Sequence, residues 1–360
     1  MKATLLKSLV EKDMQAMVEK LTLNDYYYPS LFPLEATGSL TWKSLMSDTG
    51  IPVAADVVAS GSSVPRKTRD VVSKLTGNIP KIAIARDMEE DQINELLYLQ
   101  QMASNASDVQ ALIKKVYDDI EFCFNGVNAK LEYIALQAIS TGKATFTNTN
   151  NQGIVSAYDV DFQVPTAQKT ATSITWATSA TATPIKDIQT IVKNGRKSGR
   201  RYKYILMNQD TFDNMVATAE VQKFAANFIS KITETQDKPT LTGLNFAMNN
   251  NGLPEIKIIE SFVQLEIDSA RTTVNCFYDG IVTFVTDMVQ GKTYHAKLAE
   301  ESINFQTGAF LAKRGHILVK KYVKEEPITE STLAMANAFP GWGMSQTVHL
   351  FRTDGTSWVL

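Results

Sequence analysis

Apolar residues recur at intervals of three and four positions between Ser107 and Gly142. On an α-helix this spacing places them on one face. Ser107 and Gln110 fit a capping box, and Gly142 fits a left-handed helix end. The pattern predicts one helix about three times the usual length, weakened or bent at Asn125-Gly126. An ordinary core helix of an α+β domain is the alternative. The apolar stripe comprises Val109, Leu112, Ile113, Val116, Ile120, Cys123, Val127, Leu131, Ile134 and Ala138.

The first 86 residues offer little core of their own. Residues 3–22 have a narrow apolar face and predict an amphipathic helix that needs a surface to pack on. Residues 26–33 (YYYPSLFP) contain two prolines, which favour an extended arm whose aromatic rings could dock into grooves. A loop tucked into its own domain is equally compatible with that sequence. Residues 41–86 predict a long two-stranded protrusion, with strands at 41–46 and 81–86, that leans on a partner.

Shorter patterns fill residues 87–182. An acidic start predicts a helix over 87–99, and alternating residues predict short strands at 160–164 and 172–176. Trp176 is expected to anchor a core.

A second unit, an α/β one with a central sheet, is predicted from Thr183 onward. Pro184 suits the first turn of a helix, and Asn208 suits an N-cap. The expected helices are 184–194, 211–219 and 221–232. The expected strands are 202–207, then 240–248 with 255–259 across an Asn-Gly turn, and 275–278 with 281–286 as a hairpin.

The C-terminal 45 residues begin with a strong strand pattern at 316–322. Residues 335–342 and 357–360 are apolar and look exposed. A neighbouring molecule or the chain itself could cover the terminal Trp-Val-Leu.

Composition narrows the class of protein. Hydrophobic residues make up 44% and charged residues 21%, with a net charge of −2, which is typical of a soluble globular protein and not of a strongly basic nucleic-acid binder. The two cysteines exclude a disulfide framework and fit a reducing compartment. Neither a signal peptide nor a membrane span is expected.

Candidate chemistry is sparse. His295, His316 and His349 lack metal-ligand spacing, and no phosphate-loop, dinucleotide or nucleophile-elbow motif is present. No cofactor, metal or catalytic residue is therefore assigned. Two basic clusters stand out. Arg66, Lys67 and Arg69 suit phosphate or surface ion pairs, and Lys193, Arg196, Lys197, Arg200, Arg201 and Lys203 suit nucleic acid, a neighbouring subunit or simply a helix C-terminus.

Four segments, in this order, resemble a known family. They are YPSLFP at 28–33, KIAIARD at 81–87, LEYIALQAISTGKAT at 131–145, and ATPIKDI at 182–188 followed by YILMN at 204–208. Together they resemble the major capsid proteins of tailed bacteriophages, of the lambda-type capsid protein E family.

The resemblance implies an α+β phage capsid fold with five parts. These are an N-terminal arm (1–40), an extended loop across a neighbouring subunit (41–86), a peripheral domain with a spine helix (87–182), an axial domain (183–300) and a return to the peripheral domain (301–360). No family counterpart accounts for the terminal Trp-Val-Leu.

The implied function is structural and not enzymatic. Hexamers and pentamers would close into an icosahedral shell around double-stranded DNA bound without sequence specificity, with scaffold, portal or cementing proteins as possible partners and no membrane. The chain would belong to the virion and assemble in the host cytoplasm. A nucleic-acid-binding module centred on residues 193–203 and an α/β enzyme using His295, His316 and Asp187 are the alternatives. The candidate subunit-contact residues are Tyr26, Tyr28, Phe32, Arg66, Lys67, Arg69, Arg196, Arg200 and Arg201.

Overall fold

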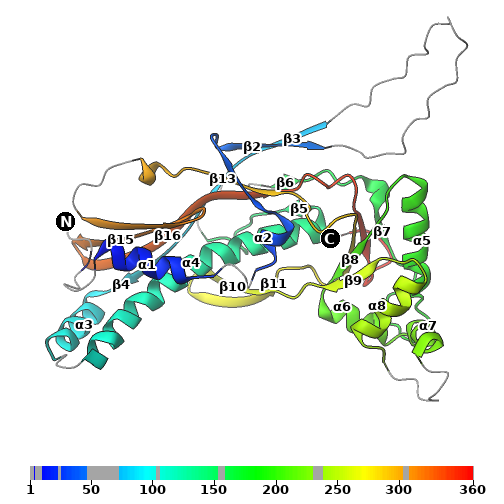
Figure 1. Ribbon diagram of the computed structural model, residues 1–360, viewed down its shortest axis with the longest axis horizontal. Helices are drawn as coiled ribbons and strands as arrows, with labels where there is room; N and C mark the ends of the chain where they lie inside the picture. The colour runs from blue at the N-terminus through cyan, green and yellow to red at the C-terminus, as the bar shows by residue number, and fades with distance from the viewer. Residues whose placement is uncertain are drawn as a thin grey trace, which may run out of the picture. The chain divides into compact units, whose positions relative to one another are not determined.

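The computed structural model describes residues 4, 10–22, 26–46, 73–102, 106–152, 159–229, 238–302 and 308–359. They combine helices and sheets, as the sequence predicts for an α+β protein, and they form two compact units (Figure 1). Unit 1 comprises residues 1–42, 77–134 and 292–341, and unit 2 comprises residues 43–76, 135–291 and 342–360.

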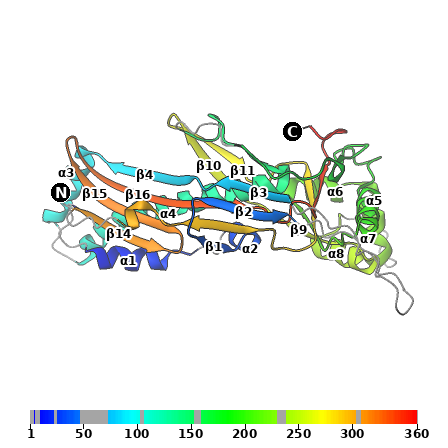
Figure 2. The ribbon, with the colours of Figure 1, turned by 90° about the horizontal axis from the view of Figure 1, so that it is seen from above.

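The sheet of unit 1 is built around one long strand, β16 (Ile328–Gly341) (Figure 2). Antiparallel partners of β16 are β15 (Ile317–Glu325), β4 (Lys81–Met88) and β13 (Lys292–Ala296). Two further strands, β1 (Leu34–Thr37) and β14 (Ala309–Arg314), pair with β13 and β15. The predicted strand at 316–322 is confirmed.

β4 corrects the expected protrusion. The sequence assigned residues 81–86 to a two-stranded extension, but β4 pairs with β16 from Lys81 to Met88. The extension retains only β2 (Thr41–Met46) and β3 (Ser73–Asn78), which form a separate two-stranded sheet.

The long helix is confirmed as α4 (Ala106–Thr141). It ends at Gly142, whose φ of 81° is left-handed and whose N–H donates to the Ala138 carbonyl at 2.8 Å. The stripe residues Cys123, Val127, Leu131 and Ile134 are fully buried. Each large apolar side chain buried in this way contributes about 1.5–3 kcal/mol.

The expected weak point at Asn125-Gly126 does not interrupt the helix. Gly126 faces β4, and a Cβ at Gly126 would lie 2.8 Å from Ile84 Cδ1 and 3.2 Å from Ile84 Cγ2. The glycine therefore lets the helix and the strand approach closely, which offsets its low helix propensity.

Among the described residues, three further helices belong to unit 1. α1 (Glu11–Lys20) lies along β14, where Gln15 both accepts from the Lys313 N–H at 2.9 Å and donates to its carbonyl at 3.1 Å. These bonds satisfy backbone groups on an edge strand, which would otherwise be open to pairing. The other two helices are α2 (Tyr28–Leu31) and α3 (Glu90–Met102), and a 3₁₀ turn spans Ala299–Glu301.

An ion pair is buried between β15 and β16. Lys321 Nζ lies 2.7 Å from Glu330 Oε1, and each side chain is 1% exposed. Thr332 Oγ1 accepts from Lys321 at 3.1 Å, and the Thr4 hydroxyl donates to Glu330 at 2.8 Å. Thr4 therefore fixes one point of the N-terminal segment to the sheet.

The sheet of unit 2 has the strand order β7-β17-β12-β8-β9. Its core includes Trp176, which is 1% exposed, as predicted. The strands are β7 (Lys169–Ala171), β17 (His349–Arg352), β12 (Ile281–Val285), β8 (Tyr204–Met207) and β9 (Glu255–Ile258). The helices are α5 (Pro184–Lys197), α6 (Gln209–Val216), α7 (Ala219–Ile229) and α8 (Leu241–Asn250), with a 3₁₀ turn at Thr166–Gln168. The described part of unit 2 also contains two small antiparallel sheets. In one, β5 (Lys143–Ala144) pairs with β6 (Val160–Asp161), and in the other, β10 (Phe262–Ile267) pairs with β11 (Ala270–Asn275).

Several sequence predictions in unit 2 were wrong. Residues 241–250 are helical. The Thr240 hydroxyl accepts from the Gly243 N–H and caps the helix, and the Asn245 side chain hydrogen-bonds to both the backbone N–H and the backbone carbonyl of Ile256. β11 pairs with β10, and β12 pairs with β8 and β17, so the expected 275–286 hairpin does not form. Residues 172–176 follow β7 as a loop.

The C-terminal segment divides between the two units. Residues 335–342 are buried within their own chain, nearly all of them in β16. β17 lies inside the sheet of unit 2, which the expected return of 301–360 to one domain did not include. Trp358 is half-buried, and Val359 is exposed.

None of the helices in the described ranges combines the length and the apolar character needed to cross a bilayer.

Candidate assembly surfaces

The ribbon formed by β2 and β3 is anchored by Trp42. The indole is 1% exposed and stacks on Phe339 and Tyr294, with ring centroids 5.7 and 6.3 Å away. A Cβ on Gly77 would lie 2.7 Å from the indole Nε1, and one on Gly341 would lie 3.1 Å from its Cε3. Aromatic packing on glycine backbone therefore holds the base of the ribbon.

Beyond this base the described backbone of the ribbon consists of two paired strands. Within the described residues, β2 and β3 hydrogen-bond as a two-stranded sheet with no third strand. An isolated two-stranded sheet is at best marginally stable in water, so another surface would stabilise it. The candidate contact residues Arg66, Lys67 and Arg69 lie outside the described residues.

Tyr28 is not a surface residue. Its hydroxyl donates to Asn128 Oδ1 at 2.7 Å, and the backbone N–H groups of Tyr27 and Tyr28 donate to the Glu132 carboxylate at 3.0 and 2.7 Å. Burial, and then the negative charge of Glu132, raises the pKa of the Tyr28 phenol. Because Glu132 satisfies two N–H groups at the start of α2, a short helix forms where the prolines predicted an extended arm.

The other two aromatic candidates also pack on their own unit. Phe32 is fully buried, and its carbonyl accepts from the Thr293 hydroxyl at 2.9 Å. Tyr26 is half-buried, with its ring 6.2 Å from that of Tyr28. The interpretation of Tyr28 and Phe32 as rings presented to a neighbour is therefore corrected, and the tucked-in alternative holds for this segment.

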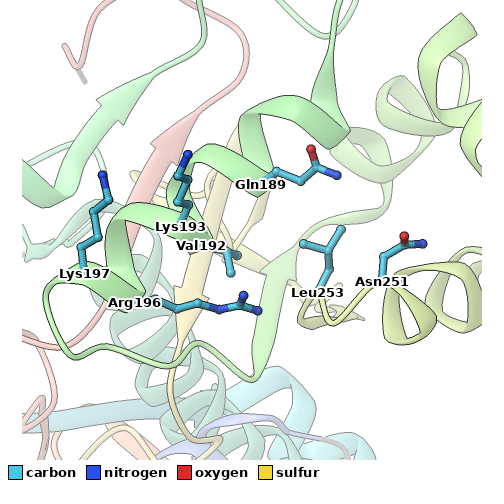
Figure 3. Close-up of a pocket in the computed structure, with 7 residues that line it drawn as sticks. All are labelled: Gln189, Val192, Lys193, Arg196, Lys197, Asn251 and Leu253. Atoms are coloured by element: carbon cyan, nitrogen blue, oxygen red, sulfur yellow. The ribbon is translucent and has the colours of Figure 1, made fainter.

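A groove runs along the last two turns of α5 in unit 2 (Figure 3). Its volume is about 570 Å³. Lys193 and Lys197 extend in the same direction from the helix, and the Arg196 guanidinium points toward Leu253 and donates to the Gly252 carbonyl at 2.8 Å. We call it the basic groove. It is lined by Gln189, Val192, Lys193, Arg196, Lys197, Asn251 and Leu253.

Only one of the three candidate arginines of unit 2 lines this groove. Arg196 does so, whereas Arg201 is exposed elsewhere. Arg200 is half-buried. Burial of the His349 imidazole, and then the positive charge of Arg200, lowers the pKa of His349 to about 4. These residues are close together in the sequence, but Arg200 and Arg201 follow the end of α5 and do not line the groove. Lys193 and Lys197 are groove residues that the sequence placed in the cluster without selecting them as contacts.

The histidines and Asp187 have structural roles. The ring centroids of His295 and His316 lie 6.0 Å apart. His295 belongs to β13 and His316 directly precedes β15, and both strands pair with β16. Burial, then the charges of His295 and Lys313, lowers the pKa of His316 to about 4. Asp187 accepts from Thr172 and Trp176 at 3.0 and 3.1 Å. Among the described residues, no group of three or more His, Cys, Asp or Glu side chains could hold a metal ion.

Comparison with solved structures identifies the fold. A candidate capsid protein of a prophage from Escherichia coli CFT073 aligns with a TM-score of 0.57 at 12% identity, over 96% of this chain and 99% of that one. A phage-related protein from Bordetella bronchiseptica RB50 aligns with a TM-score of 0.51 at 11% identity, over 98% and 99%. No curated protein matches the sequence.

The family model described as phage major capsid protein E matches residues 8–342. That match spans both units and the ribbon. The chain therefore belongs to the phage major capsid protein E family and is a structural component of the virion shell.

Proposed function

We propose that this chain self-assembles into hexamers and pentamers of an icosahedral shell that encloses double-stranded DNA without sequence specificity. The family match over residues 8–342 is the observation that carries the proposal. Heterologous contacts between identical chains generate closed rings, and rings of six and five close a shell.

The domain roles follow the same proposal. Unit 2, with residues 183–285 in its sheet and helices, acts as the axial domain, and unit 1, with α4, acts as the peripheral domain. The ribbon β2–β3, which has a fixed base at Trp42 and no third strand in the described residues, is the extended loop that lies on a neighbouring subunit. Residues 1–40 act as the arm. Assembly takes place in the host cytoplasm, with scaffold, portal and cementing proteins as the classes of partner.

Assembly of the purified chain tests the proposal. Sedimentation velocity and cryo-electron microscopy, over a rising range of subunit concentrations, should show rings of six and five and then closed shells. A chain that stays monomeric at every concentration, with and without DNA, would contradict self-assembly.

Nuclease protection tests the enclosed DNA. Shells isolated from infected cells should protect DNA from nuclease, and sequencing should show no preferred binding site. Salt should release DNA from opened shells, because only phosphate contacts hold it. Shells that protect one short sequence would contradict non-specific packaging.

A further inference from the structure

The basic groove carries positive charge that the described residues do not neutralise. Neither Lys193 nor Lys197 forms an ion pair within the described residues, and both are exposed. Arg196 is held by the Gly252 carbonyl, which neutralises no charge. The neighbouring acid Glu255 is instead paired with Lys257 at 2.6 Å.

This groove lies at one end of the sheet of unit 2. α5 ends at Lys197, and the chain then enters β8 at Tyr204. β9 runs parallel to β8 and begins beside it at Glu255, two residues after the groove residue Leu253. The groove therefore adjoins the start of both parallel strands.

Aspartates gather at the opposite end of the same sheet. β8 ends at Met207, and Asn208, the next residue, donates to Asp279. β12 and β17 are antiparallel neighbours, with Ile281 opposite Arg352. Asp279, which precedes β12, and Asp354, which follows β17, therefore lie at the same end of the sheet. From residue 203 to residue 208, the strand separates the two ends by roughly 17 Å. We call this surface the acidic end, and it consists of Asp210, Asp213, Asp279 and Asp354, all exposed.

The acidic end is only partly neutralised. Arg352 Nε lies 2.6 Å from Asp354. Asp213 and Asp279 accept from the amides of Gln209 and Asn275 at 2.8 and 3.1 Å, which add no positive charge. Burial, followed by the negative charges of Asp210 and Asp354, raises the pKa of Asp279 despite its amide partners. Negative charges that repel one another in this way favour a cationic partner.

We propose that the basic groove of one copy receives the acidic end of unit 2 of the next copy, so that opposite ends of one sheet form a head-to-tail contact. This inference rests on the proposed assembly function and names the surfaces that join its subunits. Since the two surfaces differ, the contact is heterologous and repeats around a ring. Complementary charges speed the encounter of the correct surfaces and penalise wrong ones.

The acidic end favours protein over DNA as the occupant of the groove, because it supplies opposite charge on a second copy of the same chain. Val192 and Leu253 line the groove but are only 5% and 8% exposed, so the exposed charges of Lys193 and Lys197 decide what binds there. DNA binding at the groove is the competing outcome of the test.

Charge reversal supplies that test. One variant carries Lys193→Glu and Lys197→Glu, a second carries Asp210→Lys and Asp213→Lys, and a third carries all four changes. The matched control carries Lys223→Glu and Lys238→Glu, which reverse two exposed lysines of unit 2 outside the groove. Thermal unfolding of each monomer establishes that it is folded, and sedimentation velocity and electron microscopy measure assembly.

Each of the first two variants should need a roughly tenfold or higher subunit concentration to assemble, because like charges then meet at the contact. The third variant should recover, since its two surfaces are again opposite in sign. Mixing the first two variants should give rings in which they alternate, so six-membered rings should form and five-membered rings should not. The control should assemble like the wild type.

Four results would overturn the inference. If all variants assemble like the wild type, the contact is wrong while the assembly function stands. If the third variant fails to recover although it is folded, the two surfaces do not meet. If the first variant assembles normally but loses salt-sensitive binding of a 30-base-pair duplex, the groove contacts DNA. A wild type that never assembles removes the proposed function, and this inference with it.

Discussion

The Lys321–Glu330 ion pair shows how a single residue can decide the stability of unit 1. Both side chains are almost fully buried, so each charge depends on the other. Lys321→Met should destabilise the chain by about 3–5 kcal/mol, because it leaves a carboxylate buried without its cation. Urea unfolding at pH 7 measures this loss. Replacing both residues by apolar ones should cost much less, and a double variant as unstable as the single one would contradict this account.

The buried histidines make stability depend on pH. In the folded chain the pKa of His316 and that of His349 are about 4, against 6.5 for an unperturbed histidine. Between these pH values the unfolded chain binds more protons, so the free energy of unfolding falls as the pH drops from 6.5 toward 4. The loss is at most ~3 kcal/mol per histidine.

Urea unfolding of the wild type and of His316→Gln and His349→Gln, at pH 7 and at pH 5, checks this expectation. Each variant should lose less stability on acidification than the wild type does. The variants must be compared with the wild type, because the raised pKa values of Asp119 and Asp187 have the opposite effect on how stability changes with pH. Equal losses in all three proteins would show that the histidines are not the cause.

At the scale of elements, periodic patterns were predictable and local exceptions were not. α4 could be located from its stripe and its terminal glycine, because both signals lie within the helix. The short helix α2 could not, because Glu132, a residue of α4 about a hundred positions away, supplies its N-terminal partner. β11 and β12 read as a hairpin because partner choice depends on β10 and β17 rather than on the intervening turn.

The contact between α4 and β4 offers a test of that element packing. Gly126→Val should destabilise the chain by about 1–3 kcal/mol, since a side chain there overlaps Ile84. Adding Ile84→Ala should recover part of the loss, so the double-mutant cycle should show a coupling energy of about 0.5–3 kcal/mol, the range typical of residues in contact. Additive effects in urea unfolding would mean that the glycine is not needed for close approach.

At the scale of the whole molecule, the order of segments led to the family but not to the boundaries between units. Each unit draws on three separate stretches of the chain. A boundary read along the sequence cannot show that β17 joins a sheet with β7 and β12. The candidate contacts had the same limit, since Tyr28 and Phe32 become buried only when α2 packs on α4 and β13.

Removing the ribbon separates folding from assembly. Replacing residues 43–76 by a short Gly-Ser linker retains Trp42 and Gly77, the residues that fix its base. Because the ribbon beyond Trp42 has no third strand within the described residues, its loss should change the melting temperature by only a few degrees. Assembly should be abolished if the ribbon lies on a neighbouring subunit. A companion variant, Trp42→Ala in the full chain, should lower stability by about 3–5 kcal/mol through the cavity it leaves. Normal shells from the linker variant would show that the ribbon is dispensable, and a linker variant that unfolds would show that it belongs to the core of its own chain.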